Sequence, residues 1–170
     1  RGYDSAGIAT LSNNKINEIK SEGRVDKLES NSLIKNMEGT IGIGHVRWAT
    51  HGLPNSINAH PHSSQNVSVV HNGIIENYST LREVLIRKGF VFKSETDTEV
   101  LVNLISDIYY ADGLNFEQAV EAALNQVVGT YGIVTFCRDE PNKLVAARHG
   151  SPLVLGVGND EFFIASDASP

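Results

Sequence analysis

Short runs of alternating apolar and polar residues open the chain and predict a β-hairpin. Residues 6–11 and 15–20 are the two predicted strands, and Asn13 and Asn14 lie between them. Asparagine tolerates positive φ, so this pair suits a two-residue turn. Residues 24–37 follow with apolar positions at approximately helical spacing, which predicts a helix.

Glycines interrupt the next apolar run. This run, residues 40–46, is predicted to be a strand followed by a long loop to about Asn66. Residues 67–71 are a further short predicted strand. Asn77 is placed to cap a helix, and Asn115 precedes another helix with one apolar face.

The second half of the chain predicts helices and strands in separate groups. The segment Thr96-Asp97-Thr98-Glu99 has the spacing of a capping box and predicts the start of a long helix. Strand-like runs come after the helices, at residues 131–137, 143–147, 152–157 and 161–166. Because strands and helices are grouped, the pattern predicts an α+β fold with mainly antiparallel sheets, as one domain over residues 1–170.

The composition fits a folded domain and excludes several other classes. Of the 170 residues, 41% are hydrophobic and 20% are charged, which excludes a disordered chain and a collagen-like repeat. No apolar run approaches the ~20 residues that span a bilayer, so no membrane association is expected. The 14 Lys and Arg against 20 Asp and Glu give a net charge of −6, which disfavours nucleic acid as a partner. A single cysteine fits a reducing compartment and predicts a cytoplasmic location.

Arg47 and Trp48 lie in the segment richest in candidate chemistry, residues 42–52. A guanidinium presents a fork of donors that matches a carboxylate. Arg47 is therefore either a ligand for the carboxylate of a bound molecule or a structural arginine paired with a carboxylate of the core. Spacing alone favours the structural alternative.

Histidines are concentrated in the same region. Five of the six lie between residues 45 and 71. A zinc site from His51, His60 and His62 is one interpretation, but no cysteine lies nearby and no His-Glu-x-x-His helix is present. Hydrogen-bonded loop histidines are favoured, and no metal or other cofactor is predicted.

Three further positions each allow a structural and a chemical interpretation. Asn72-Gly73 is typical of a hairpin turn, but an asparagine amide and a backbone N–H at one sharp turn also resemble an oxyanion hole. Asp97 either complements the dipole of a helix or binds an ammonium group. Cys137 ends an apolar run and is predicted to be a small buried residue, not a nucleophile.

Several segments together resemble the N-terminal-nucleophile (class II) glutaminase domains of the isomerising glutamine–fructose-6-phosphate transaminases, the glucosamine-6-phosphate synthases. They keep the order of that family and spread over most of the chain. The matching segments are Arg1-Gly2-Tyr3-Asp4-Ser5-Ala6-Gly7, Gly44-His45, Arg47-Trp48-Ala49-Thr50-His51-Gly52, Asn58-Ala59-His60-Pro61-His62, His71-Asn72-Gly73-Ile74-Ile75-Glu76-Asn77-Tyr78, Ser94-Glu95-Thr96-Asp97-Thr98-Glu99 and Gly129-Thr130-Tyr131-Gly132.

The resemblance implies an αββα sandwich, with two antiparallel sheets between helices, here incomplete at both ends. It implies that a thiolate attacks the side-chain amide of L-glutamine, releasing ammonia and then glutamate. In the full-length enzyme the ammonia would pass to a downstream sugar-isomerase domain and convert fructose 6-phosphate to glucosamine 6-phosphate, and the full-length enzyme would be a homodimer.

The same resemblance implies roles for individual residues. Arg47 would bind the α-carboxylate of glutamine and Asp97 its α-ammonium group. Asn72 and the backbone N–H of Gly73 would form the oxyanion hole. The remaining pocket residues would be Trp48, Thr50, His51 and His60.

One feature of the family pattern is missing from these residues. The family nucleophile is the N-terminal Cys of the mature chain, with its own α-amine as base, and it lies upstream of the segment that begins at Arg1. The sequence therefore indicates a piece of a longer protein and predicts that this piece alone is inactive. The alternatives are a nucleophile-less glutamine-binding or regulatory module, a related amidotransferase with another acceptor, and, more distantly, a metal hydrolase.

Overall fold

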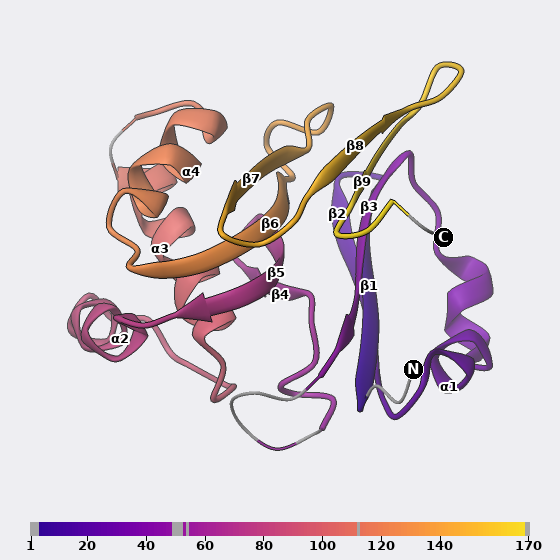
Figure 1. Ribbon diagram of the computed structural model, residues 1–170, viewed down its shortest axis with the longest axis horizontal. Helices are drawn as coiled ribbons and strands as arrows, with labels where there is room; N and C mark the ends of the chain where they lie inside the picture. Colours follow the sequence, from indigo (N-terminus) through magenta and orange to yellow (C-terminus); the bar gives the residue numbers. More distant parts are fainter. Residues whose placement is uncertain (1–3, 49–52, 54, 112, 169–170) are drawn as a thin grey trace.

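The computed structural model describes residues 4–48, 53, 55–111 and 113–168, which form four layers (Figure 1). Two antiparallel sheets pack face to face. Helices α2, α3 and α4 cover the outer face of one sheet, and α1 covers the outer face of the other. In the described residues, every helix is too short or too polar to cross a membrane.

The first sheet has the strand order β2-β1-β3 and begins with the predicted hairpin. Strands β1 (Ser5–Ser12) and β2 (Lys15–Glu22) pair antiparallel, and β3 (Ile41–Arg47) pairs with the other edge of β1. Asn13 and Asn14 have φ values of 50° and 57°. These values are those of a two-residue hairpin turn that follows the twist of the strands, so the prediction is confirmed.

The helix predicted over residues 24–37 is two shorter elements. Helix α1 covers Val25–Glu29, and a 3₁₀ helix covers Ser32–Asn36. Asn31 separates them in an extended conformation, and its side chain accepts a hydrogen bond from the N–H of Leu33. An asparagine side chain that binds nearby backbone competes with continued helix, which explains the break.

The second sheet has the order β4-β5-β6-β7, and a separate hairpin follows it. The four strands are His62–Ser64, Val67–Ile75, Gly129–Cys137 and Val145–His149. The hairpin consists of β8 (Val154–Val157) and β9 (Phe162–Ala165). All four strand runs predicted after the helices are present, whereas β4 lies inside the predicted loop because a three-residue strand leaves too short a pattern to detect.

The turn predicted at Asn72-Gly73 is wrong. Strand β5 continues through both residues to Ile75, and Asn72 pairs with Gly132 of β6. Gly73 has a φ of 144°, and a Cβ there would lie 2.1 Å from the carbonyl oxygen of Thr130. The glycine therefore serves a close backbone approach within a strand pair, and long-range pairing overrides the local turn preference.

Three helices form the layer over the second sheet. They are α2 (Tyr78–Arg87), α3 (Asp97–Ala111) and α4 (Phe116–Leu124). Asn115 forms the complete capping box of α4 with Gln118. Asn77 does not cap α2; its side chain instead bridges to the backbone of Gln126 and Val128, at 2.8 and 3.0 Å.

The capping box predicted for α3 is half formed. Thr96 Oγ1 accepts the N–H of Glu99 at 3.2 Å, as predicted. The Glu99 carboxylate does not return to Thr96 but accepts the N–H groups of Lys93 and Ser94, at 2.8 and 2.6 Å. The loop before α3 is therefore tied to the first turn of the helix.

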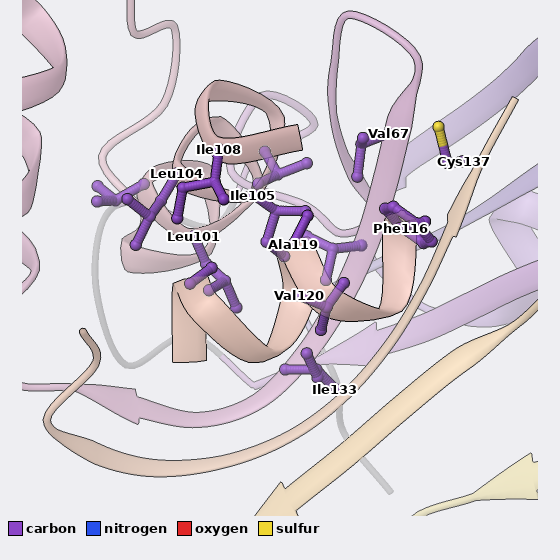
Figure 2. Close-up of a cluster of buried hydrophobic side chains, with 14 of the residues drawn as sticks. Val67, Leu101, Leu104, Ile105, Ile108, Phe116, Ala119, Val120, Ile133 and Cys137 are labelled. Atoms are coloured by element: carbon purple, nitrogen blue, oxygen red, sulfur yellow. The ribbon is translucent and has the colours of Figure 1, made fainter. Parts of the chain in front are cut away.

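The main core lies between α3, α4 and the second sheet (Figure 2). Phe116, Ile105 and Ile133 are fully buried there, and Cys137 lies among them. Burial raises the pKa of the Cys137 thiol, and the prediction that this cysteine is a buried core residue is confirmed. A second cluster, which includes Phe136, fills the space between the two sheets.

We predict that Phe116→Ala lowers the free energy of unfolding by about 3–5 kcal/mol, because it leaves a cavity in the main core. Phe162→Ala is the matched control, since Phe162 is 68% exposed on β9; its effect should stay below about 1 kcal/mol. Urea unfolding followed by circular dichroism measures both. Equal losses for the two variants would contradict this assignment of the core.

Candidate functional site

A cavity of about 550 Å³ lies between the two sheets and reaches the start of α3. It brings together all the predicted site residues that the structure describes, which are Arg47, Trp48, His60, Asn72, Gly73 and Asp97. Two more, Thr50 and His51, lie outside the described residues. The cavity is thus built from the end of β3, the middle of β5 and the first turn of α3.

Arg47 is the last residue of β3 and is only 5% exposed. One of its guanidinium nitrogens, Nη1, lies 4.0 Å from Asp4 Oδ1 and 3.5 Å from the carbonyl oxygen of Leu53. The two sequence interpretations of Arg47 are therefore compatible, because the residue has a carboxylate near it and also lines the cavity. Trp48, next in the chain, is 68% exposed at the cavity.

Asp97 is the first residue of α3 and is buried. Its Oδ2 accepts the N–H of Ile75, the last residue of β5, at 2.9 Å. The dipole of the helix and this hydrogen bond both interact favourably with a negative charge. The cavity wall thus carries a cationic residue from the first sheet and an anionic residue from the layer over the second.

Asn72 and Gly73 lie side by side on β5 and line the same cavity. Opposite Asn72 across the strand pair lies Gly132, which also lines the cavity and has no side chain to fill it. The wall therefore offers an asparagine amide next to a glycine with an unusual backbone conformation. These are the components of a hydrogen-bonding site for a developing negative charge.

Four histidines form a cluster at the cavity, of which His60, His62 and His71 are buried and His45 is half-buried. The His45 and His60 ring centroids are 4.4 Å apart, and those of His60 and His62 are 5.2 Å apart. His71 Nδ1 lies 3.1 Å from Thr98 Oγ1. His62 Nε2 lies 3.0 Å from Thr96 Oγ1. The hydrogen bonds predicted for the histidines are therefore present for His62 and His71, but both residues lie on strands and not in a loop.

Burial keeps these histidines neutral at neutral pH. It lowers the pKa of His45 to about 4 and that of His62 to about 3, and it also lowers the pKa of His60 and His71. Neighbouring histidines and Arg47 add to the effect for His45 and His60. Within the described residues, no three His, Cys, Asp or Glu side chains are arranged to hold a metal ion.

Sequence reasoning did not single out Thr96 and Thr98 as site residues. Both line the cavity, and each contacts a histidine of the cluster. Their place in the chain on either side of Asp97 is the one signal that could have identified them. Cys137 does not line the cavity.

Comparison with known proteins identifies the family. Residues 45–170 match the model of the glutamine amidotransferase domain. The chain is 53% identical over 173 residues to glutamine–fructose-6-phosphate aminotransferase [isomerizing] of Bacteroides thetaiotaomicron, and 53% identical over 169 residues to the protein of the same name from Clostridium perfringens. These alignments take in 100% and 98% of the chain but only 28% and 27% of the two relatives.

Solved structures agree at the level of the fold. The glutamine phosphoribosylpyrophosphate amidotransferase of B. subtilis superposes with a TM-score of 0.81 at 26% identity, over 97% of this chain and 36% of that one. A structure described as the allosteric regulatory enzyme of purine biosynthesis gives 0.83 at 27% identity, with the same coverage. The predicted αββα fold of N-terminal-nucleophile amidotransferases is confirmed, and the chain belongs to the glutamine amidotransferase domain family.

Proposed function

We propose that this chain is the glutaminase part of a glutamine–fructose-6-phosphate aminotransferase. In the full-length enzyme this part hydrolyses L-glutamine to glutamate and ammonia, and the ammonia is used to convert fructose 6-phosphate to glucosamine 6-phosphate. The observation that carries the proposal is the single cavity that holds Arg47, Asp97 and Asn72-Gly73. The relatives that bear this enzyme name, at 53% identity, support the choice of acceptor.

The two charged residues suit the α-amino acid group of glutamine. Arg47 presents a guanidinium, whose donors match the α-carboxylate, and Asp97 presents a carboxylate for the α-ammonium group. Both are buried, so their attraction to a zwitterion is screened less than at a surface. Trp48 and His60 line the same cavity, and Thr50 and His51 stay predictions from the family resemblance.

Holding the amino acid group at two points directs its side-chain amide along the cavity. The amide carbonyl then lies at Asn72 and Gly73. Attack on the amide carbon places negative charge on its oxygen, and the Asn72 side-chain amide and the Gly73 backbone N–H donate hydrogen bonds to that oxygen. Neutral histidines around the cavity leave Arg47 as the matching charge for the α-carboxylate.

The nucleophile in this proposal is a cysteine outside the 170 residues, at the N-terminus of the mature protein. The cysteine's own α-amine takes the thiol proton, and the thiolate forms a bond to the amide carbon. The C–N bond then breaks while the protonated amine of the cysteine donates this proton to the leaving nitrogen, and ammonia departs. Water then cleaves the glutamyl thioester to glutamate and regenerates the thiol. Cys137 is fully buried in the main core, away from the cavity, which argues against it as the nucleophile.

The partners follow from the same proposal. A sugar-isomerase domain of the same polypeptide receives the ammonia, the full-length enzyme is a homodimer, and the protein works in the cytoplasm. This chain covers only 28% and 27% of the two relatives, which leaves room for such a domain. A nucleophile-less glutamine-binding module is the second candidate, because the recognition residues are present while the one thiol of the chain lies in the core.

We predict that Arg47→Lys in the full-length protein lowers kcat/KM for glutamine by at least ~10²-fold. The ammonium group of lysine keeps the charge but cannot form two parallel hydrogen bonds to one carboxylate. Ammonia release against glutamine concentration measures the effect. A kcat/KM within about threefold of wild type would remove Arg47 from the carboxylate site.

We predict that Asn72→Ala lowers the kcat of ammonia release by about 10²–10³-fold, the loss expected for one oxyanion donor, with a much smaller change in KM. Cys137→Ser is the control and should keep the wild-type kcat wherever it folds. A normal kcat with a raised KM would place Asn72 in recognition instead of catalysis. Loss of activity in a folded Cys137→Ser variant would make Cys137 the nucleophile.

A further inference from the structure

We infer that Asn58 and Glu95 are positioning residues for glutamine recognition. They hold the backbone of Leu53, and the Leu53 carbonyl group contacts Arg47. The inference rests on the proposed function for its substrate. Neither residue lines the cavity. They connect the segment after β3 to the loop before α3, and so connect the two elements that carry Arg47 and Asp97.

Asn58 and Glu95 bind each other through both side chain and backbone. The N–H of Glu95 donates to Asn58 Oδ1 at 3.0 Å, and Asn58 Nδ2 donates to Glu95 Oε2 at 3.2 Å. Asn58 is only 1% exposed. A buried amide whose acceptor and donor are both used holds one orientation, because any other orientation would leave polar atoms unsatisfied.

Asn58 and Glu95 bind both backbone groups of Leu53, its N–H and its carbonyl oxygen. Glu95 Oε2 accepts the N–H of Leu53 at 3.3 Å, and Asn58 Nδ2 donates to the carbonyl oxygen of Leu53 at 3.0 Å. The Leu53 side chain is not packed, since the residue is 69% exposed. Within the described part of the chain, these two hydrogen bonds are therefore the contacts that hold this backbone.

The Leu53 carbonyl oxygen in turn faces Arg47, with Nη1 at 3.5 Å. A carbonyl dipole at that distance favours one placement of the guanidinium. The position of the Arg47 head thus depends on where Asn58 and Glu95 hold Leu53.

Several hydrogen bonds hold the loop that carries Glu95. The Glu99 carboxylate accepts the N–H groups of Lys93 and Ser94, and Thr96 Oγ1 lies 3.0 Å from His62 Nε2. Asp97 follows Thr96 directly. Glu95 therefore links the loop before Asp97 to the backbone near Arg47. This link sets the distance between the two side chains that recognise the α-carboxylate and the α-ammonium group.

The geometry also defines a conservative variant. Leu53 N–H and Asn58 Nδ2 both donate to the same oxygen, Glu95 Oε2. A glutamine side chain can place its one carbonyl oxygen there and keep both contacts, whereas alanine keeps neither. Glu83→Ala is the matched control, because among the described residues the one polar contact of Glu83 is an exposed i,i+4 pair with Arg87 on α2.

The test compares Glu95→Ala, Glu95→Gln and Glu83→Ala in the full-length protein. Glu95→Ala should raise KM for glutamine about tenfold or more with kcat within about threefold, since the affected contact lies at the amino acid group and not at the reacting amide. Glu95→Gln should restore KM to within about threefold of wild type. Glu83→Ala should match wild type.

Titration calorimetry with L-glutamate separates this inference from the proposed function. A wild-type protein that binds glutamate but releases no ammonia from glutamine would refute glutamine hydrolysis. In that case, a tenfold loss of glutamate affinity in Glu95→Ala that is restored in Glu95→Gln would still support the inference. Unchanged KM and unchanged glutamate affinity in Glu95→Ala would overturn the inference. So would a loss in kcat alone, or a folded Glu95→Gln variant as impaired as Glu95→Ala.

Discussion

The site depends on two buried charges of opposite sign that are held on different layers of the sandwich. Arg47 ends a strand of one sheet, and Asp97 begins a helix packed on the other. Burying an unpaired charge is costly, so each group needs partners in the protein. Asp4 and Leu53 provide them for Arg47, and the N–H of Ile75 provides one for Asp97. Both charges are therefore already in place for a zwitterionic ligand, and binding needs no further free energy to bring them together.

Backbone constraints around β5 shape the other end of the cavity. Gly73 approaches the Thr130 carbonyl so closely that a Cβ would lie 2.1 Å from it, and Gly132 opposite Asn72 leaves the wall open. The strand pair thus exposes the Asn72 amide and the Gly73 backbone next to each other. The main core, which β5 and β6 form with α3 and α4, fixes this strand pair relative to Asp97.

Local signals predicted much of the fold, and long-range pairing explains the failures. The Asn13-Asn14 turn and the burial of Cys137 follow from nearby residues and are confirmed. Asn72-Gly73 carries an equally strong local turn signal, but both residues stay within strand β5 because they pair with β6. The site residues were predicted chiefly through the family resemblance. The contact of Asn58 with Glu95, 37 positions apart, leaves no periodicity in the sequence to predict it.

The most direct test of this account is a crystal structure of the full-length protein with L-glutamate, the expected product. We expect α-carboxylate oxygens within about 3.2 Å of the Arg47 guanidinium nitrogens and the α-ammonium nitrogen within about 3.2 Å of an Asp97 carboxylate oxygen. The side-chain carboxylate should point toward Asn72 and Gly73. Glutamate bound with its α-carboxylate and α-ammonium group away from Arg47 and Asp97 would contradict the account.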